Sequence, residues 1–273
     1  MIPRKAALSI ALLCFVGLLA LGTGSPDHLS MPDLAQVYKS PLEVLPFGTD
    51  QRGRPLLDYA RQGASVILLP AVVAGLAVGM MGVLGGLLRC VGSARVDTVV
   101  QAFGEIVGSL PRMVVILIAA LLIPAGSRGL LPLALAWAML ASPGAMDEAA
   151  SVAERLGGAR FVEALRAHGF SWSRVHLYHI VLLNLRPVVV RQAAETLMQV
   201  TFLEIALSYL SIVENQSSFT HPDNLRSWAD LLQMGYPSLV LDVPTGHALG
   251  LGIGLVGVMT TMSLMVSSAA RAR

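Results

Sequence analysis

Charged and aromatic side chains are scarce in this sequence of 273 residues. Only 13% of the residues are charged and 5% are aromatic, whereas a soluble domain has about a quarter of its residues charged. Hydrophobic residues make up 55% of the chain, and its mean hydropathy is +0.68. This composition excludes a soluble enzyme and indicates an integral membrane protein.

Lysine is almost absent, which restricts the chemistry that the chain can perform. Neither Lys5 nor Lys39 follows a GxxxxG phosphate loop, so we expect no ATP site in this chain. No GxSxG or HExxH motif occurs, and we predict no catalytic residue. His176 and His179 stand three residues apart without an obvious third ligand, so we predict no metal site and interpret them as solvated or headgroup-facing.

Neither the two cysteines nor the net charge indicates a reactive site or a binding partner. Cys14 and Cys90 each lie inside an apolar run and are interpreted as small hydrophobic residues. The net charge is +2, and no patch of mixed basic and aromatic residues indicates a nucleic-acid partner.

Long apolar stretches are what the sequence has in abundance, and a spanning helix needs about 20 such residues. Six candidate spans cover residues 6–23, 64–88, 106–125, 129–146, 185–212 and 239–268. We therefore predict an all-α integral membrane fold of six transmembrane helices. Its expected parts are an N-terminal helix (1–23), an extracytoplasmic loop (24–62) and a core of five helices (63–273) with a cytoplasmic loop at 147–181. The first stretch also resembles a signal peptide, but an even number of spans favours a retained helix.

Positive charges orient these spans, because Lys and Arg accumulate on the cytoplasmic side of a membrane. They gather at both chain ends and between the fourth and fifth spans: Arg4, Lys5, Arg155, Arg160, Arg166, Arg174, Arg271 and Arg273. We expect both termini and the loop at 147–181 to be cytoplasmic, and residues 24–62 and 213–238 to lie outside.

Glycines recur every four residues in two of the spans. Gly75 and Gly79 form one GxxxG pair, Gly82 and Gly86 form another, and Gly246, Gly250 and Gly254 repeat the spacing near the C-terminus. Small residues let helix backbones approach closely in lipid. We predict that these positions pack within this one subunit rather than along a dimer seam.

The fifth span is unusually polar. Arg191, Gln192, Glu195, Gln199 and Glu204 interrupt an otherwise apolar segment. Charges inside a bilayer normally face a bundle interior or an aqueous cavity, so Glu195, Gln199 and Glu204 are candidates for a translocation path. A structural role, with Glu195 paired to Arg191 one turn away, stays open. Pro187 is predicted to begin this helix.

The segment ARFVEALRAHG (159–169) predicts a short amphipathic helix. Phe161 and Leu165 are four residues apart and form an apolar ridge, with Val162 beside them. Arg160, Glu163 and Arg166 are spaced by three on another face. Gly169 can adopt the left-handed conformation that ends a helix.

Several short stretches, taken in order, resemble the inner-membrane permeases of bacterial ABC importers for dipeptides, oligopeptides and nickel. FGTDQRGRPLL (47–57) resembles the segment before that family's second helix. RVDTVVQAFGEIVGSLP (95–111) resembles a later family segment, with Asp97 and Pro111 matching and Glu105 in place of an Asp. LEIALSYLSI (203–212) and SWADLL (227–232) resemble later family motifs. The segment at 159–180 resembles the family's EAA loop, with Leu165 in place of an alanine and Leu182 in place of a proline. The departures indicate a divergent member.

This resemblance implies a type I ABC importer permease in the bacterial inner membrane, with no cofactor of its own because the partner subunits bind ATP. The implied partners are a second homologous permease, two cytoplasmic ATPase subunits and an extracytoplasmic solute-binding protein. The EAA-like residues would couple to the ATPase: Phe161, Val162, Glu163, Ala164, Leu165, Arg166 and Gly169. Short peptides are the favoured substrate, a nickel or metal-chelate importer is the alternative, and a non-transporting accessory scaffold stays open.

Overall fold

A computed structural model describes residues 4–25, 29–91, 94–124, 129–157, 160–171, 174–175, 184–213, 225–239, 241 and 245–271. The α-helices are α1 (Arg4–Thr23), α2 (Leu56–Val91), α3 (Ala94–Ser109), α4 (Arg112–Leu122), α5 (Leu130–Gly157), α6 (Arg160–Ala167), α8 (Arg186–Val213), α9 (Trp228–Gly235) and α10 (Gly246–Arg271). Two 3-10 turns, η1 (Leu34–Gln36) and η4 (Tyr236–Leu239), complete the described elements. These residues contain no β-strand, as the all-α prediction requires.

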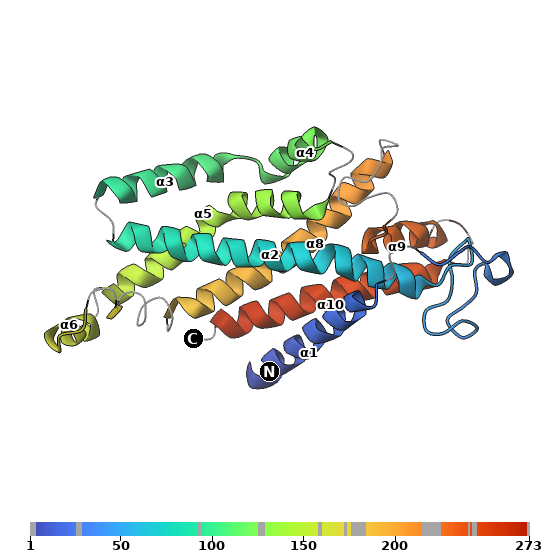
Figure 1. Cartoon of the computed structure of the whole chain (residues 1–273), viewed down its shortest axis with the longest axis horizontal. Helices are drawn as coiled ribbons and strands as arrows, with labels where there is room; N and C mark the ends of the chain where they lie inside the picture. Colours follow the sequence, from blue (N-terminus) through green and yellow to red (C-terminus); the bar gives the residue numbers. More distant parts are fainter. Residues whose placement is uncertain are drawn as a thin grey trace.

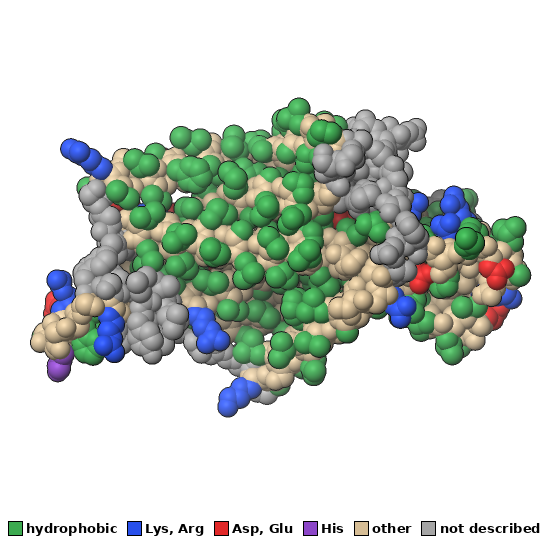
Figure 2. All heavy atoms as spheres, viewed as in Figure 1, with side chains coloured by type: hydrophobic (Ala, Val, Ile, Leu, Met, Phe, Trp, Pro, Cys, Tyr) green, Lys and Arg blue, Asp and Glu red, His purple; other side chains and the backbone are tan. Residues whose placement is uncertain are grey.

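The long helices run side by side along one axis of the molecule (Figure 1). The segment at 29–55 and α9 lie at one end, whereas α6 lies at the other. The start of α1 and the end of α10 both point toward the α6 end. Figure 2 shows apolar side chains over the middle of the visible face, with most charged side chains at its two ends. This banding matches a hydrocarbon layer between two polar regions.

Four helices are long and apolar enough to cross a membrane, namely α1, α2, α5 and α10. The bent pair of α3 and α4 adds a fifth if it counts as one span. Helix α8 has 28 residues but carries Arg186, Arg191, Glu195 and Glu204, so it is less apolar than these spans. The described residues therefore support a multi-pass membrane protein, and the predicted count of six is not confirmed.

The third predicted span is wrong as a single helix over 106–125. Helices α3 and α4 meet at 79° around Pro111, which caps α4. Proline has no backbone N–H to continue the helix and forces the preceding residue toward extended geometry, so the chain turns there. Helix α5 also runs beyond the predicted span 129–146 to Gly157, and α2 starts at Leu56, before the predicted residue 64.

The glycines of α2 let two neighbouring helices approach its backbone. A Cβ atom added at Gly79 would lie 2.8 Å from Val189 Cγ1 of α8, and one at Gly82 would lie 2.8 Å from Ala145 Cβ of α5. This confirms packing within the subunit for α2. The same prediction is wrong for two positions of α10, because added Cβ atoms at Gly250 and Gly254 would meet nothing within 4 Å.

The segment before α2 folds around the Asp50 carboxylate. Its Oδ1 accepts hydrogen bonds from the backbone N–H groups of Arg52 and Arg54 at 2.7 and 2.8 Å, and the Tyr59 hydroxyl donates to Oδ2 at 2.7 Å. Gly53 has a φ of +72°, and a Cβ atom there would lie 1.8 Å from the Asp33 carbonyl oxygen. Only glycine fits this turn, so the GTDxxGR stretch forms a compact cap on one end of the helices.

Candidate functional site: a polar cluster between α5, α8 and α10

Helix α8 carries the polar side chains that the sequence singled out. It begins at Arg186 with Pro187 in its first turn, as predicted. Over the next turns it presents different residues to α5 and to α10. The partners of these residues decide which of them can serve a transport path.

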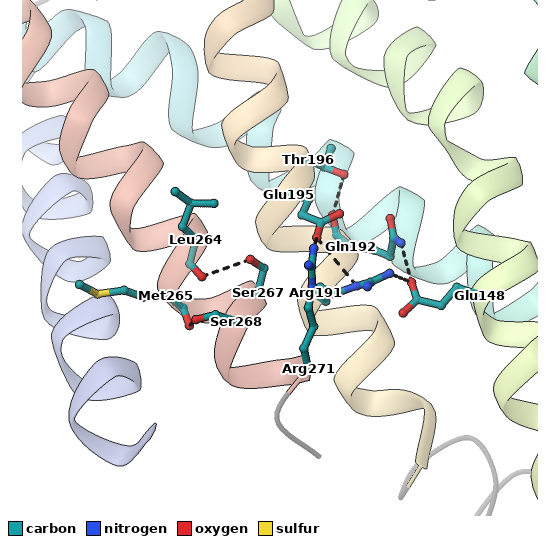
Figure 3. Close-up of polar contacts among 10 residues, drawn as sticks. All are labelled: Glu148, Arg191, Gln192, Glu195, Thr196, Leu264, Met265, Ser267, Ser268 and Arg271. Carbon is teal, nitrogen blue, oxygen red and sulfur yellow. Dashed lines mark hydrogen bonds and ion pairs between the residues drawn. The ribbon is translucent and has the colours of Figure 1, made fainter. Parts of the chain in front are cut away.

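Arg191 and Gln192 both bind Glu148 of α5 (Figure 3). The Arg191 guanidinium forms an ion pair with the Glu148 carboxylate, and the Gln192 amide donates to the same oxygen at 2.7 Å. The side chains of Arg191 and Glu148 are 22% and 24% exposed. The ion pair is thus partly buried, and the Gln192 amide adds a hydrogen bond to the Glu148 carboxylate.

Glu195 connects α8 to the end of α10. The Arg271 guanidinium lies 3.0 Å from its Oε1, and Arg191 Nε lies 3.9 Å from the same oxygen (Figure 3). The predicted pairing of Glu195 with Arg191 is therefore present, and a closer cation from α10 joins it. Together Glu148, Arg191, Gln192, Glu195 and Arg271 form what we call the polar cluster.

A cavity of about 590 Å³ adjoins the polar cluster. Its polar lining comes from Glu148, Arg155, Asn184, Arg191 and Arg271, and its apolar lining from Val152, Leu156, Pro187, Val188 and Ala270. The cavity lies where α5, α8 and α10 end near α6. It has room for a small polar solute or for movement of the helix ends around it.

Gln199 and Glu204 lie farther along α8 and do not reach the polar cluster. The Trp137 indole N–H of α5 donates to the side-chain amide oxygen (Oε1) of Gln199 at 2.9 Å. Glu204 is fully buried, and the Ser208 hydroxyl donates to its carboxylate at 2.8 Å. The structure thus separates the three candidate path residues into three environments, and their part in translocation stays a prediction.

All coupling candidates except Gly169 lie on α6, which projects from the end of the molecule (Figure 1). Glu163, Ala164 and Arg166 are exposed and Leu165 is partly buried, while the side chains of Phe161 and Val162 lie outside the described set. His176 and His179 lie outside the described residues as well.

Gly169 ends α6 in the left-handed conformation that its position predicts. Its φ is +81°, its N–H donates to the Arg166 carbonyl at 2.9 Å, and the Phe170 N–H donates to the Leu165 carbonyl at 3.1 Å. These two bonds form a Schellman motif, which satisfies carbonyls that the helix end would leave open. A glycine is needed here because other side chains resist a positive φ.

Sequence reasoning missed three members of this region, namely Glu148, Arg271 and Trp137. Glu148 fell outside the predicted fourth span, although it continues the helical register of that span. Arg271 counted only as a marker of orientation. No local pattern in the sequence shows that Arg271 meets Glu195, which is 76 residues away.

One curated relative carries the comparison with known proteins, and no protein-family model matches the chain. The chain is 28% identical over 166 residues to the dipeptide transport system permease protein DppC of Lactococcus lactis subsp. cremoris. The match covers 61% of this chain and 47% of the relative, so the chain spans about half the length of the curated relative it matches. This similarity confirms the resemblance that the motifs indicated.

Proposed function

We propose that this chain, a divergent relative of ABC importer permeases, is the membrane subunit of an importer that moves short peptides into the cell. Its similarity to a dipeptide permease is the observation that carries the proposal. The chain would work by alternating access in the inner membrane, with both termini cytoplasmic. It would act with a second permease, two ATPase subunits and a solute-binding protein.

Helix α6 is the element that would receive force from an ATPase subunit. It follows α5 closely in the chain and projects beyond the helices that surround it (Figure 1). The Schellman motif at Gly169 fixes the direction in which the chain leaves it. A short helix with defined ends transmits a displacement better than a flexible loop does.

The polar cluster offers a route from α6 into the membrane helices. Helix α5 leads to α6, and the ion pair between Glu148 and Arg191 joins α5 to α8 near that end. A movement of α6 would therefore pull on α8 as well as on α5. The pair between Glu195 and Arg271 would extend the same movement to α10.

The test removes the apolar ridge of α6 by combining Phe161→Ala with Leu165→Ala. We expect normal membrane insertion, at least a tenfold loss of co-purified ATPase subunit, and loss of labelled dipeptide uptake. The matched control combines Met31→Ala with Leu42→Ala, two apolar residues that are 90% and 94% exposed in the 29–55 segment.

Each result has a defined meaning. A ridge variant that keeps its ATPase subunit and its uptake would show that α6 is not the coupling element. A wild-type chain that never brings down an ATPase subunit would instead indicate an accessory scaffold. Uptake of chelated nickel without uptake of dipeptide would move the substrate to metal chelates.

A further inference from the structure

A second cavity, of about 220 Å³, lies between α1, α8 and α10. Six of its seven lining residues have apolar side chains, and the seventh is Arg186: Leu8, Arg186, Pro187, Val190, Val266, Ala269 and Ala270. Leu8 and Val190 are each 38% exposed, so they lie on the surface rather than in the core. We call this cavity the α1–α8 groove.

One cation, Arg186, lines the α1–α8 groove, and a second, Lys5, lies one helical turn before the lining residue Leu8. Arg186 begins α8 and is exposed. Lys5 is exposed on α1 and precedes Leu8 by three residues, which places both on one face of that helix. Neither cation has an ion-pair partner among the residues that the structure describes.

Acidic side chains are rare around the groove. Helices α1 and α10 contain no Asp or Glu within their bounds. On α8, the acid nearest to Arg186 is Glu195, and it is already paired with Arg271. The local charge beside the groove is therefore positive and lacks a counter-charge from the described part of the chain.

From this arrangement we propose that the α1–α8 groove binds an anionic phospholipid. Lys5 and Arg186 hold the phosphate, and an acyl chain lies along Leu8, Val190 and Val266. Basic sites at the ends of transmembrane helices recognise anionic headgroups, and each Lys or Arg near such a surface contributes about a fivefold gain in binding. A soluble anion would gain nothing from the apolar lining, because it has no hydrocarbon to bury there.

The inference is independent of transport, because lipid binding is measured on the purified chain without partners. The full chain in detergent is incubated with phosphatidylglycerol or phosphatidylcholine of identical acyl chains, and bound lipid is counted by native mass spectrometry. We expect at least tenfold preference for phosphatidylglycerol. The double variant Lys5→Gln with Arg186→Gln is expected to abolish this preference.

Two further variants separate charge from shape. Val190→Phe fills the groove and leaves both cations in place, so it is expected to reduce binding of both lipids by at least threefold. The matched charge control combines Lys39→Gln with Arg52→Gln at the opposite end of the molecule and is expected to retain the full preference. Circular dichroism confirms that each variant is folded.

Three outcomes would overturn the proposal. One is equal binding of the two lipids by the wild-type chain. Another is an unchanged preference in the folded Lys5→Gln and Arg186→Gln variant. The third is competition by glycerol 3-phosphate as effective as that by phosphatidylglycerol, which would make the site one for a soluble phosphate.

Discussion

At the scale of single residues, two of the charges on α8 are matched by partners on other helices. Arg191 has Glu148, and Glu195 has Arg271. Arg191 and Glu148 are only 22% and 24% exposed, so leaving either charge without its partner would cost free energy. These ion pairs neutralise the charges and also join α5, α8 and α10. The same contacts can therefore stabilise the fold and couple the movements of the three helices.

The pair of Glu148 and Arg191 is expected to show measurable coupling in a double-mutant cycle. We expect Glu148→Gln and Arg191→Gln to be non-additive by about 1–2 kcal/mol in the free energy of unfolding, as for contacting charged residues. Denaturant titration in detergent micelles measures it. The control is the exposed ion pair of Lys39 and Glu43, in which Lys39 Nζ lies 2.8 Å from Glu43 Oε2. The hydrogen bond and the charge of Lys39 lower the pKa of the Glu43 carboxyl. We expect a weaker coupling there, because the pair is exposed. Additive effects at Glu148 and Arg191 would contradict the prediction.

Asp50 is expected to stabilise the folded conformation of the 29–55 segment. The change Asp50→Asn replaces one of two acceptor oxygens by an amide donor, so the bonds from Tyr59 or from the backbone at Arg52 and Arg54 are lost. The expected cost is about 1–3 kcal/mol, which limited proteolysis would report as faster cleavage of the segment. The control is Asp33→Asn, because one oxygen of Asp33 accepts a single bond from Ala35 that asparagine can replace. Equal cleavage of both variants would refute this role of Asp50.

At the scale of elements, α2 holds the bundle together by close backbone approach. Its glycines meet α8 at Val189 and α5 at Ala145. Such contacts depend on shape, because hydrophobicity does not drive helices together in lipid. Larger side chains on α2 would push its neighbours apart, whereas the open glycines of α10 tolerate them.

Gly82→Val is therefore expected to destabilise the bundle by about 1–3 kcal/mol, as overpacking does. Gly254→Val makes the same chemical change where nothing lies within 4 Å of an added Cβ atom. It is expected to leave the thermal unfolding midpoint in detergent within a degree or two of the parent. Comparable loss of stability in both variants would mean that valine acts through helix propensity rather than packing.

At the scale of the whole molecule, the two ends differ in what they carry. One end has α6 and the end of α10, and the other has the 29–55 segment and α9 (Figure 1). The polar cluster includes Arg271 at the end of α10. We expect these two ends to face different compartments. The arginine distribution predicts that the α6 end is cytoplasmic.

Labelling of single cysteines tests this orientation in intact cells. One cysteine is placed at each end of the molecule, as Leu42→Cys and Ala167→Cys, both at exposed positions. A membrane-impermeant maleimide is expected to label Leu42→Cys from outside and Ala167→Cys only after the membrane is opened. The parent chain, with Cys14 and Cys90, is the control for background. Labelling of Ala167→Cys from outside would invert the whole topology.

The sequence by itself determined the class of the protein and several local features. Apolar content determined a helical membrane fold, Pro187 the start of α8, and Gly169 the end of α6. The two helix ends depend on the backbone preferences of a single proline or glycine, and the membrane class depends on composition. None of them depends on which helices pack together.

Only the tertiary structure decided which side chains meet. Helical periodicity shows that Glu195 and Gln199 lie near one face of α8, but it cannot say that one binds Arg271 and the other Trp137. These partners lie on other helices, and their choice depends on how α5, α8 and α10 pack along their whole length. The 79° bend between α3 and α4 was missed for a related reason. A proline in an apolar stretch is compatible with a kinked span or with two separate helices, and packing against the neighbouring helices selects between them.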